Sequence, residues 1–147
     1  MYDLFSILTP ILLTLTAALP AKCLRVVDGD TIHLKDGRKV RLLDIDAPEI
    51  KQPWGLQSKK FLADLIEGKE IELIGSRKDR YGRTLATVKL GDLDVNKRLV
   101  EMGHAWHYRR YSKSKEFADL ELKARAKGLG LWAPPKAPWE WRRRKRK

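Results

Sequence analysis

The sequence predicts an α+β fold in which a small five-stranded β-barrel, such as an OB-fold, carries about three helices. Five short segments show the β-branched or alternating apolar pattern of strands, and three others show helical spacing of their apolar residues. Their order along the chain is three strands, one helix, two strands and two helices. At 147 residues with 43% hydrophobic content, the chain has room for one domain with a real core.

The first three strands are expected at residues 23–27, 30–34 and 38–45. Asp28 and Gly29 stand between two β-branched runs, which is typical of a two-residue hairpin turn. The Lys-Asp-Gly sequence at residues 35–37 predicts a second turn. Each of these strands is therefore expected to be joined to the next by a short connection.

The remaining strands are expected at residues 70–76 and 84–90, and the helices at residues 53–68, 94–103 and 114–127. Asp94 is a suitable N-cap for the second helix, and Gly68 and Gly128 are suitable stops for the first and third. Leu131 and Trp132, which follow the last helix, are expected to pack back on the body of the domain.

The first residues differ in composition from the rest, and residues 1–23 are predicted to be a signal peptide or an N-terminal anchor. Residues 5–19 are apolar and uncharged, but they are too few for a comfortable membrane span. Small residues at 16–18 suit a cleavage site, whereas Asp3 and the lack of a preceding Lys or Arg do not suit a signal. We expect a secreted or periplasmic protein, with membrane anchoring as the alternative.

The other end of the chain, residues 134–147, is predicted to be a flexible basic tail. It contains three prolines, two tryptophans and six consecutive basic residues, a composition that does not form a core. Lysine and arginine bind phosphates and indoles stack on exposed bases, so contact with nucleic acid is expected there, with a purely solvated tail as the alternative. The folded domain between the two ends is expected at residues 24–133.

The charge of the chain indicates a polyanionic partner. Lys and Arg number 31 against 19 Asp and Glu, which gives a formal net charge of +12. Nucleic acid and an anionic membrane surface are both compatible with this balance. The alternative is that the charge only keeps the protein soluble. Because Cys23 is the only cysteine, an internal disulfide and a CxxC metal site are excluded. The three histidines lack the partners that would complete a zinc site.

Three polar loops contain the residues of a candidate catalytic site. Carboxylates are preferred ligands of hard cations such as Ca²⁺, so Asp30 and Asp46 are expected to hold one ion. Guanidinium groups match phosphate oxygens in a bidentate manner, which makes Arg41 and Arg83 candidate phosphate clamps. Glu49 would then accept a proton from the attacking water, or orient it.

The spacing of Arg41 and Asp46 sets a condition on this site. The two residues are five apart, so they face opposite sides of a regular strand. They share a site only if the strand bends, bulges or ends between them, as strands often do beside active sites. Asp44 falls on the same side as Asp46, but we expect it to be a solvent-facing acid rather than a ligand.

The motifs "VVDGDTIHL", "RLLDIDAPE" and "DRYGR", in this order and spacing, resemble those of the staphylococcal nuclease (thermonuclease) family. The resemblance extends from about Leu24 to Trp132. It implies an OB-fold barrel with three helices and Ca²⁺-dependent hydrolysis of DNA and RNA. It also implies metal binding by Asp30, Asp46 and the backbone carbonyl of Ala47, an essential role for Glu49, phosphate binding by Arg41 and Arg83, and nucleotide contacts by Tyr81 and Tyr111.

Two departures from the family pattern affect the properties of the metal site and the affinity for substrate, but both leave the site itself in place. The staphylococcal enzyme has threonine where this chain has Ala47, and alanine keeps the carbonyl but loses the hydroxyl. The lysine-rich loop that follows the glutamate is shortened here, around residues 51–55, which bears on substrate affinity.

The sequence therefore predicts a Ca²⁺-dependent endonuclease that acts on DNA and RNA as a monomer, without an obligate protein partner. The alternative from another class is a catalytically silent OB-fold module that only binds nucleic acid. Such modules typically lose the acids and arginines, whereas all five are present here, which favours the enzyme. A basic protein of membrane surfaces, the third possibility, leaves these five polar residues unexplained.

Overall fold

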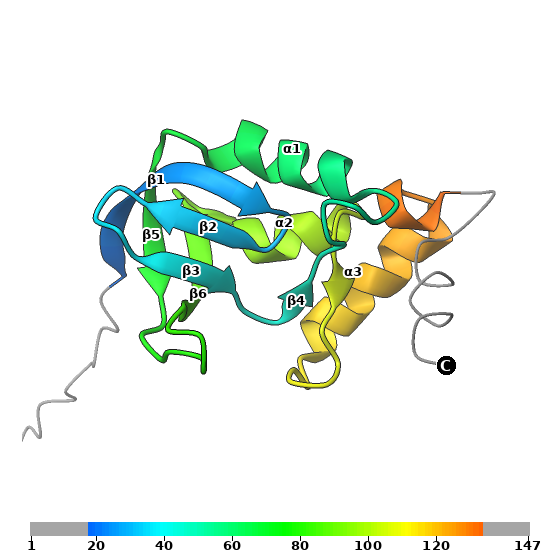
Figure 1. Cartoon of the computed structure of the whole chain (residues 1–147). Coiled ribbons are helices and arrows are strands. Elements are labelled where there is room, and N and C mark those ends of the chain that lie inside the picture. Colours follow the sequence, from blue (N-terminus) through cyan, green and yellow to red (C-terminus); the bar gives the residue numbers. More distant parts are fainter. Residues whose placement is uncertain (1–17, 134–147) are drawn as a thin grey trace, which may run out of the picture.

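A closed five-stranded β-barrel forms the body of the protein in the computed structural model, which describes residues 18–133 (Figure 1). The barrel strands are β1 (Leu19–Asp28), β2 (Thr31–Leu34), β3 (Lys39–Leu42), β5 (Glu70–Ile74) and β6 (Thr84–Leu90). β1 pairs antiparallel with β2 and β5, β2 pairs with β3, and β5 pairs with β6. A parallel pairing between β3 and β6 closes the barrel, which confirms the predicted OB-fold class.

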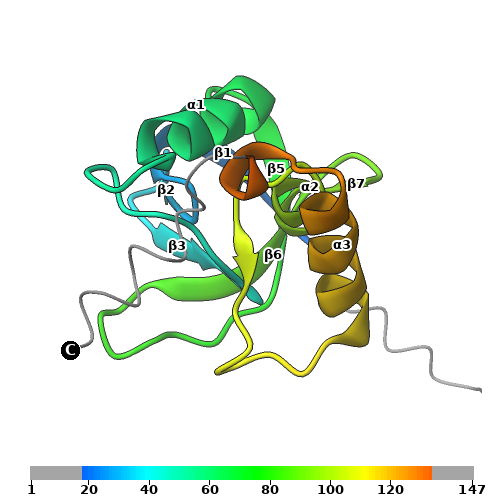
Figure 2. The same cartoon turned by 90° about the vertical axis from the view of Figure 1, so that its right-hand side faces the viewer.

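Three helices and several short elements complete the domain in the predicted order. They are β4 (Ile45–Asp46), α1 (Gly55–Ile66), β7 (Leu93–Asp94), α2 (Val95–Glu101), β8 (Trp106–His107), α3 (Lys115–Ala126) and a 3-10 helix (Gly130–Trp132). The two-residue strands escaped prediction because so short a segment shows no periodicity. α1 lies along β1, while α2 packs between β6 and α3 on another side of the barrel (Figures 1 and 2).

The apolar faces of these elements meet in one core. The buried side chains in it include Ala21, Cys23, Val26, Ile32, Leu34, Val40, Leu42, Leu62, Ile66, Ile71, Leu73, Ala86, Val88, Val95, Leu99, Val100 and Phe117. Burying a valine, leucine or isoleucine contributes about 1.5–3 kcal/mol, so this core holds the barrel and helices together. Within residues 18–133, no helix combines the length and the apolar character that a membrane span requires.

The first strand of the barrel begins earlier than the sequence predicts, at residue 19 rather than residue 23. β1 starts at Leu19, and residues 19–22 pair with β5. Ala21 and Cys23 are 8% and 0% exposed and belong to the core. The apolar run before them hid this strand, because its first residues read as the end of a leader. Residues 19–23 of the predicted leader are thus part of β1, whereas its residues 1–17 and the predicted basic tail at 134–147 lie outside the described residues.

The turn between β1 and β2 consists of Gly29 and Asp30, one residue later than predicted. A Cβ atom at Gly29 would lie 2.7 Å from the Cβ of Ala47 and 2.8 Å from the Cβ of Ser58. Only glycine therefore allows this turn to approach both the segment after β4 and helix α1. This close approach brings Asp30 to the end of β3 and to β4.

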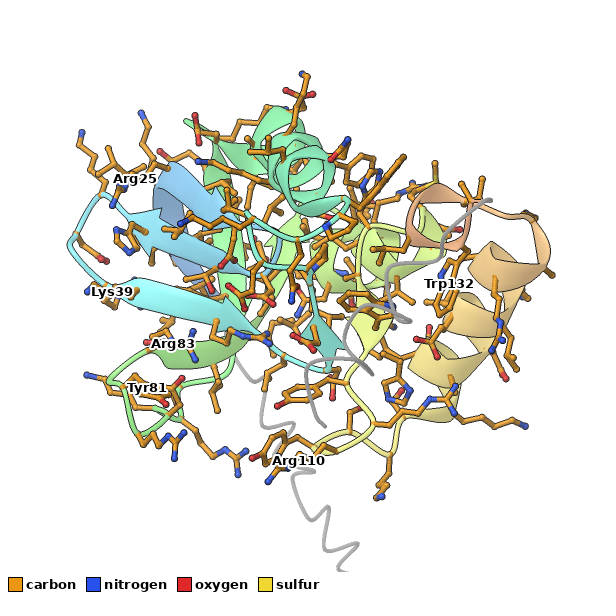
Figure 3. All side chains as sticks on the ribbon, turned by 45° about the vertical axis from the view of Figure 1, so that its right-hand side comes forward. Arg25, Lys39, Tyr81, Arg83, Arg110 and Trp132 are labelled. Carbon is orange, nitrogen blue, oxygen red and sulfur yellow. The ribbon has the colours of Figure 1, made fainter. Side chains whose placement is uncertain are left out.

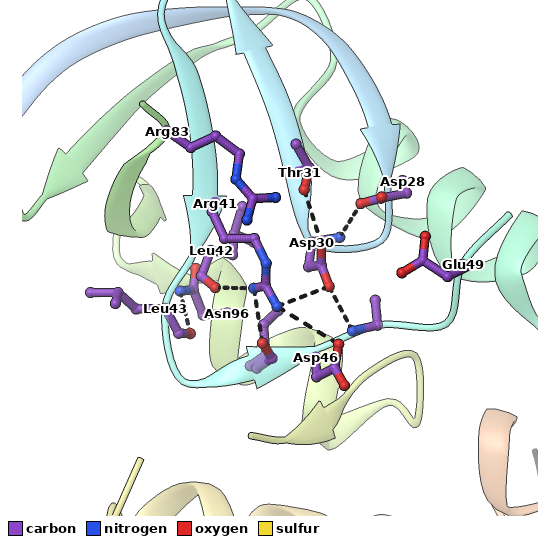
Figure 4. A network of polar contacts seen from close by, with 12 residues as sticks. Asp28, Asp30, Thr31, Arg41, Leu42, Leu43, Asp46, Glu49, Arg83 and Asn96 are labelled. Atoms are coloured by element: carbon purple, nitrogen blue, oxygen red, sulfur yellow. Dashed lines mark hydrogen bonds and ion pairs between the residues drawn. The ribbon is translucent and has the colours of Figure 1, made fainter. Parts of the chain in front are cut away.

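A buried asparagine on α2 holds the end of β3 in place. Asn96 is fully buried; its Oδ1 accepts a hydrogen bond from the Val88 N–H at 3.0 Å. Its Nδ2 donates to the carbonyl oxygens of Leu43 and Ala86, at 3.0 and 3.2 Å. One side chain thus connects β6 to the bend that follows β3 (Figure 4).

We expect Asn96→Ala to lower the free energy of unfolding by about 2–4 kcal/mol, because buried backbone donors and acceptors lose their partner. Urea denaturation followed by circular dichroism measures the change. Asp92→Ala, at the exposed turn after β6, is the control and should change stability by less than about 0.5 kcal/mol. An Asn96→Ala loss as small as that of the control would contradict this role.

Candidate active site

The bend between β3 and β4 meets the condition that the sequence set for Arg41 and Asp46. β3 ends at Leu42, and Asp44 adopts a left-handed conformation with a φ of 65°. β4 then pairs with β8, and the N–H of Tyr108 donates to the carbonyl of Asp44 at 2.8 Å. Because β3 ends between them, Arg41 and Asp46 lie on the same side. A strand end was one of the three arrangements, besides a bend or a bulge, that would let them share a site.

Arg41 lies at the centre of the acidic residues (Figure 4). Its Nη2 is 3.3 Å from Asp30 Oδ2 and 3.7 Å from Asp46 Oδ1, and the Arg41 side chain is only 12% exposed. Its Nη1 donates to the carbonyl oxygens of Leu42 and Ile45, at 2.6 and 2.9 Å. The guanidinium therefore binds two carboxylates and both sides of the bend; its predicted role as a phosphate clamp stays a prediction.

The carboxylate of Asp30 is oriented from two sides. Its Oδ1 accepts a hydrogen bond from Thr31 Oγ1 at 3.0 Å, and its Oδ2 accepts one from the Ala47 N–H at 2.8 Å. The backbone of Ala47 thus adjoins Asp30 directly. Asp46 adjoins Asp30 through their shared contact with Arg41, and metal binding by these two residues and the Ala47 carbonyl stays a prediction.

Asp28 is a member of this cluster that the sequence interpretation missed. Its Oδ1 accepts a hydrogen bond from the Asp30 N–H at 3.0 Å. Burial raises the pKa of Asp28 to about 7, and the charges of Asp30 and Glu49 raise it in the same direction. The available signal was the pair of aspartates in "DGD" at the end of a strand, but the first was interpreted only as a turn residue.

Glu49 stands in a tight loop before α1 and faces the acidic cluster (Figure 4). Its N–H donates to Gln52 Oε1 at 2.7 Å, and its carbonyl accepts from the Gln52 N–H at 2.8 Å. A Cβ atom at Gly55, the first residue of α1, would overlap the Glu49 carbonyl oxygen. Glycine at that position therefore lets the loop fold against the helix with the exposed Glu49 side chain beside Asp28.

Arg83 is held in position by a second residue that the sequence interpretation missed. Asp79 accepts hydrogen bonds from Arg83 Nε at 2.7 Å and from the Arg83 N–H at 3.0 Å. Burial opposes ionisation of Asp79, but bonds from Arg83 and from the Tyr81 N–H lower its pKa. The ring of Tyr81, 66% exposed, lies 5.4 Å from the Arg83 guanidinium carbon. The "DRYGR" loop thus fixes its arginine beside an exposed aromatic ring.

The second predicted aromatic contact, Tyr111, lies on the loop after β8. Its side chain is 72% exposed, and its ring meets that of Tyr108 edge to face at 5.0 Å. The Arg41 guanidinium carbon is 5.8 Å from the centre of the Tyr108 ring, which connects this loop to the acidic cluster. Figure 3 shows Tyr81 and Arg110, the neighbour of Tyr111, on the same lower part of the molecule.

The chemistry of the cluster fits a hard cation. Within residues 18–133 no three His, Cys, Asp or Glu side chains form a preformed metal cluster, and Arg41 supplies positive charge between two of the acids. The available donors, however, are all oxygens, which Ca²⁺ prefers. Asp28 and Glu49 add their carboxylates to those of Asp30 and Asp46, and a divalent ion would balance part of this negative charge (Figure 4).

The barrel and this combination of acids, arginines and exposed tyrosines define the class of the protein as an OB-fold nuclease domain. Residues 39–134 match the family described as "Staphylococcal nuclease homologue". The chain belongs to the staphylococcal nuclease family.

Relatives from several bacteria cover most of the chain. An uncharacterized endonuclease of Haemophilus influenzae is 42% identical over 85% of this chain and 74% of its own length. An uncharacterized endonuclease of Escherichia coli O157:H7 is 41% identical over 89% of this chain and 90% of its own length. A micrococcal nuclease of Shigella flexneri is 40% identical over 81% of this chain and 78% of its own length.

We expect Asp28→Asn to stabilise the metal-free protein above pH 7 by about 1–2 kcal/mol. The folded-state pKa of Asp28, about 7, exceeds its ordinary value of 3.8, so the native protein loses stability as the pH rises between these values. Asparagine does not ionise and keeps an acceptor for the Asp30 N–H. The gain should therefore appear across this pH window and stay constant above it. Urea denaturation in chelator, repeated over the pH range, measures it.

Asp36→Asn is the matched control for this prediction. Hydrogen bonds from Arg38 lower the pKa of the exposed Asp36, so its amide variant should gain no stability as the pH rises. If the free energy of unfolding of Asp28→Asn differs from that of wild type by the same amount at every pH, the pKa of Asp28 is not raised in the folded protein.

Proposed function

We propose that the protein is a Ca²⁺-dependent endonuclease that hydrolyses phosphodiester bonds in DNA and RNA and acts as a monomer. The observation that carries this proposal is the meeting of Asp30, Asp46 and Arg41 at one end of the barrel, with Glu49 and Arg83 beside them. Membership of the staphylococcal nuclease family, and relatives named endonuclease or micrococcal nuclease, support the class of reaction.

The acidic residues and the backbone would hold the ion. Asp30, Asp46 and the carbonyl of Ala47 are the ligands that we propose, with Asp28 as a further negative charge at the site. When bound, Ca²⁺ would supply charge stabilisation for a phosphoryl oxygen. The ordered Asp30 carboxylate suits this task, because its two hydrogen-bond donors fix its orientation before any ligand arrives.

The remaining residues act on the phosphodiester and the water. Glu49 accepts a proton from a water molecule as its oxygen attacks phosphorus, and an ester P–O bond on the opposite side breaks. Arg83 and Arg41 bind the phosphoryl oxygens, on which negative charge grows during attack. Asp79 holds the guanidinium of Arg83 at its Nε, which leaves the outer nitrogen atoms of that side chain for a phosphate.

We also propose that the protein works outside the cytoplasm, as a secreted or periplasmic enzyme. The support is the apolar, uncharged run at residues 5–19, of which residues 5–17 lie outside the described part of the chain. An anchored form of the protein is the alternative.

Removal of divalent ions should abolish hydrolysis. Full-length protein incubated with single-stranded DNA should degrade it with Ca²⁺, lose the activity in chelator, and regain little with Mg²⁺, which requires shorter and more regular coordination. Gel analysis of the products measures this. Binding of DNA with no cleavage under any of these conditions would identify the silent binding module instead, and equal cleavage in chelator would refute the metal assignment.

We expect Glu49→Gln to lower kcat by about 10²-fold or more, which is the scale of a lost general base. Glutamine keeps the size of the side chain, so nucleotide affinity should change little. Glu72→Gln, on the exposed face of β5, is the control and should keep the wild-type rate. Steady-state kinetics with a defined oligonucleotide compares the three proteins; a Glu49→Gln rate within twofold of wild type would remove Glu49 from this role.

A further inference from the structure

Three basic side chains lie opposite one another on the outer surface of the barrel. Arg25 on β1 pairs in register with His33 on β2, and His33 pairs in register with Lys39 on β3. The Nη2 of Arg25 is 3.4 Å from the Nδ1 of His33. We call Arg25, His33 and Lys39 the basic row; it crosses three neighbouring strands at a right angle to their direction.

The basic row lies on the same face of the sheet as the candidate active site. Side chains two residues apart on a strand point to the same face, so Lys39 shares its face with Arg41, at a distance along the strand of about 7 Å. His33 shares its face in the same way with Thr31, the donor to Asp30. Figure 3 shows Arg25, Lys39, Arg83 and Tyr81 following one another down one side of the molecule.

The row carries positive charge that no described residue neutralises. Arg25 and Lys39 stand on either side of His33, and Arg25 donates a hydrogen bond to the His33 ring. Within residues 18–133 neither Arg25 nor Lys39 forms an ion pair, although arginines and lysines elsewhere in this part do. Burial, together with the charges of Arg25 and Lys39, lowers the pKa of His33. The row therefore lacks a negative partner within the fold, and an external anion would supply it.

We propose that the basic row is a second phosphate-binding subsite, which holds the nucleic-acid strand next to the point of cleavage. This inference rests on the proposed function, because the strand that enters the active site is the one that the row would hold. Arginine and lysine contact phosphates without regard to sequence, and the row contains no Phe, Tyr or Trp side chain on which a base would stack. The row would therefore bind the backbone and add affinity for long substrates.

The test compares two double variants of the full-length protein with equal loss of charge. Arg25→Gln/Lys39→Gln removes two charges from the row. Lys123→Gln/Lys127→Gln removes two exposed charges from the C-terminal end of α3, on another side of the molecule (Figure 1). Binding of a long single-stranded oligonucleotide is measured in chelator, which prevents cleavage, at several salt concentrations. The same proteins are tested with phosphatidylserine-containing vesicles.

We expect the row variant to flatten the dependence of log K on log[salt] by about 1.4, that is, about 0.7 for each of two lost phosphate contacts. The control variant should keep the wild-type slope. Because Arg25 and Lys39 are exposed and form no ion pair within residues 18–133, the melting temperature of the row variant should match that of wild type. A flatter salt dependence of binding together with an unchanged melting temperature supports the proposal.

Other outcomes would overturn it. An unchanged slope in the row variant, or an equal decrease in both variants, would show that the row makes no specific phosphate contact. Loss of vesicle binding with an unchanged oligonucleotide slope would assign the row to a membrane surface. The proposed function is tested separately, by hydrolysis of DNA in the presence of Ca²⁺. If wild-type protein cleaves DNA and the row variant keeps the wild-type salt slope, only the subsite is refuted. If wild-type protein does not cleave DNA, the proposed nuclease function is refuted.

Discussion

The contact of one buried arginine with two aspartates is the interaction on which the rest of the site depends. Arg41 is almost enclosed, and a charge in that position is tolerated only when it is paired and fully hydrogen-bonded. Its partners come from the β1–β2 turn, through Asp30, and from β4, through Asp46, while both sides of the bend bind it through carbonyls. Three segments distant in sequence must therefore meet at this guanidinium.

The barrel supplies what this meeting requires. The parallel pairing of β3 with β6 fixes the end of β3, and Asn96 then joins β6 to the bend, so that the bend cannot move independently of the core. At Gly29 the absence of a side chain lets the β1–β2 turn reach the same place. The carboxylates gathered at this end of the barrel repel one another, and the rigid frame of the barrel keeps them together despite this repulsion.

The sequence predicted the elements better than the contacts. Strand alternation and helix caps gave the order of the barrel strands and the three helices, and three motifs placed Arg41, Asp46 and Asp30 in one site before the bend was visible. Asp28 and Asn96 could not be found in this way, because a turn aspartate or a first-turn asparagine looks the same whether it faces solvent or the interior. The start of the barrel was missed for a similar reason, since apolar residues of a leader and of a strand have the same composition.

The distribution of charge explains why so basic a chain keeps its acids in one small area. Asp28, Asp30, Asp46 and Glu49 would repel a polyanion if their field extended over the surface, but Arg41 offsets part of it at close range, and Debye screening limits the rest to about 8–10 Å. Arg25 and Lys39 on the outer surface of the barrel, and Arg83 on its loop, lie along one side of the molecule (Figure 3), where the proposed nucleic-acid substrate would make its first contact. In the function that we propose, this arrangement would attract phosphate through the periphery and present carboxylates only at the point where a metal ion and an attacking water are needed.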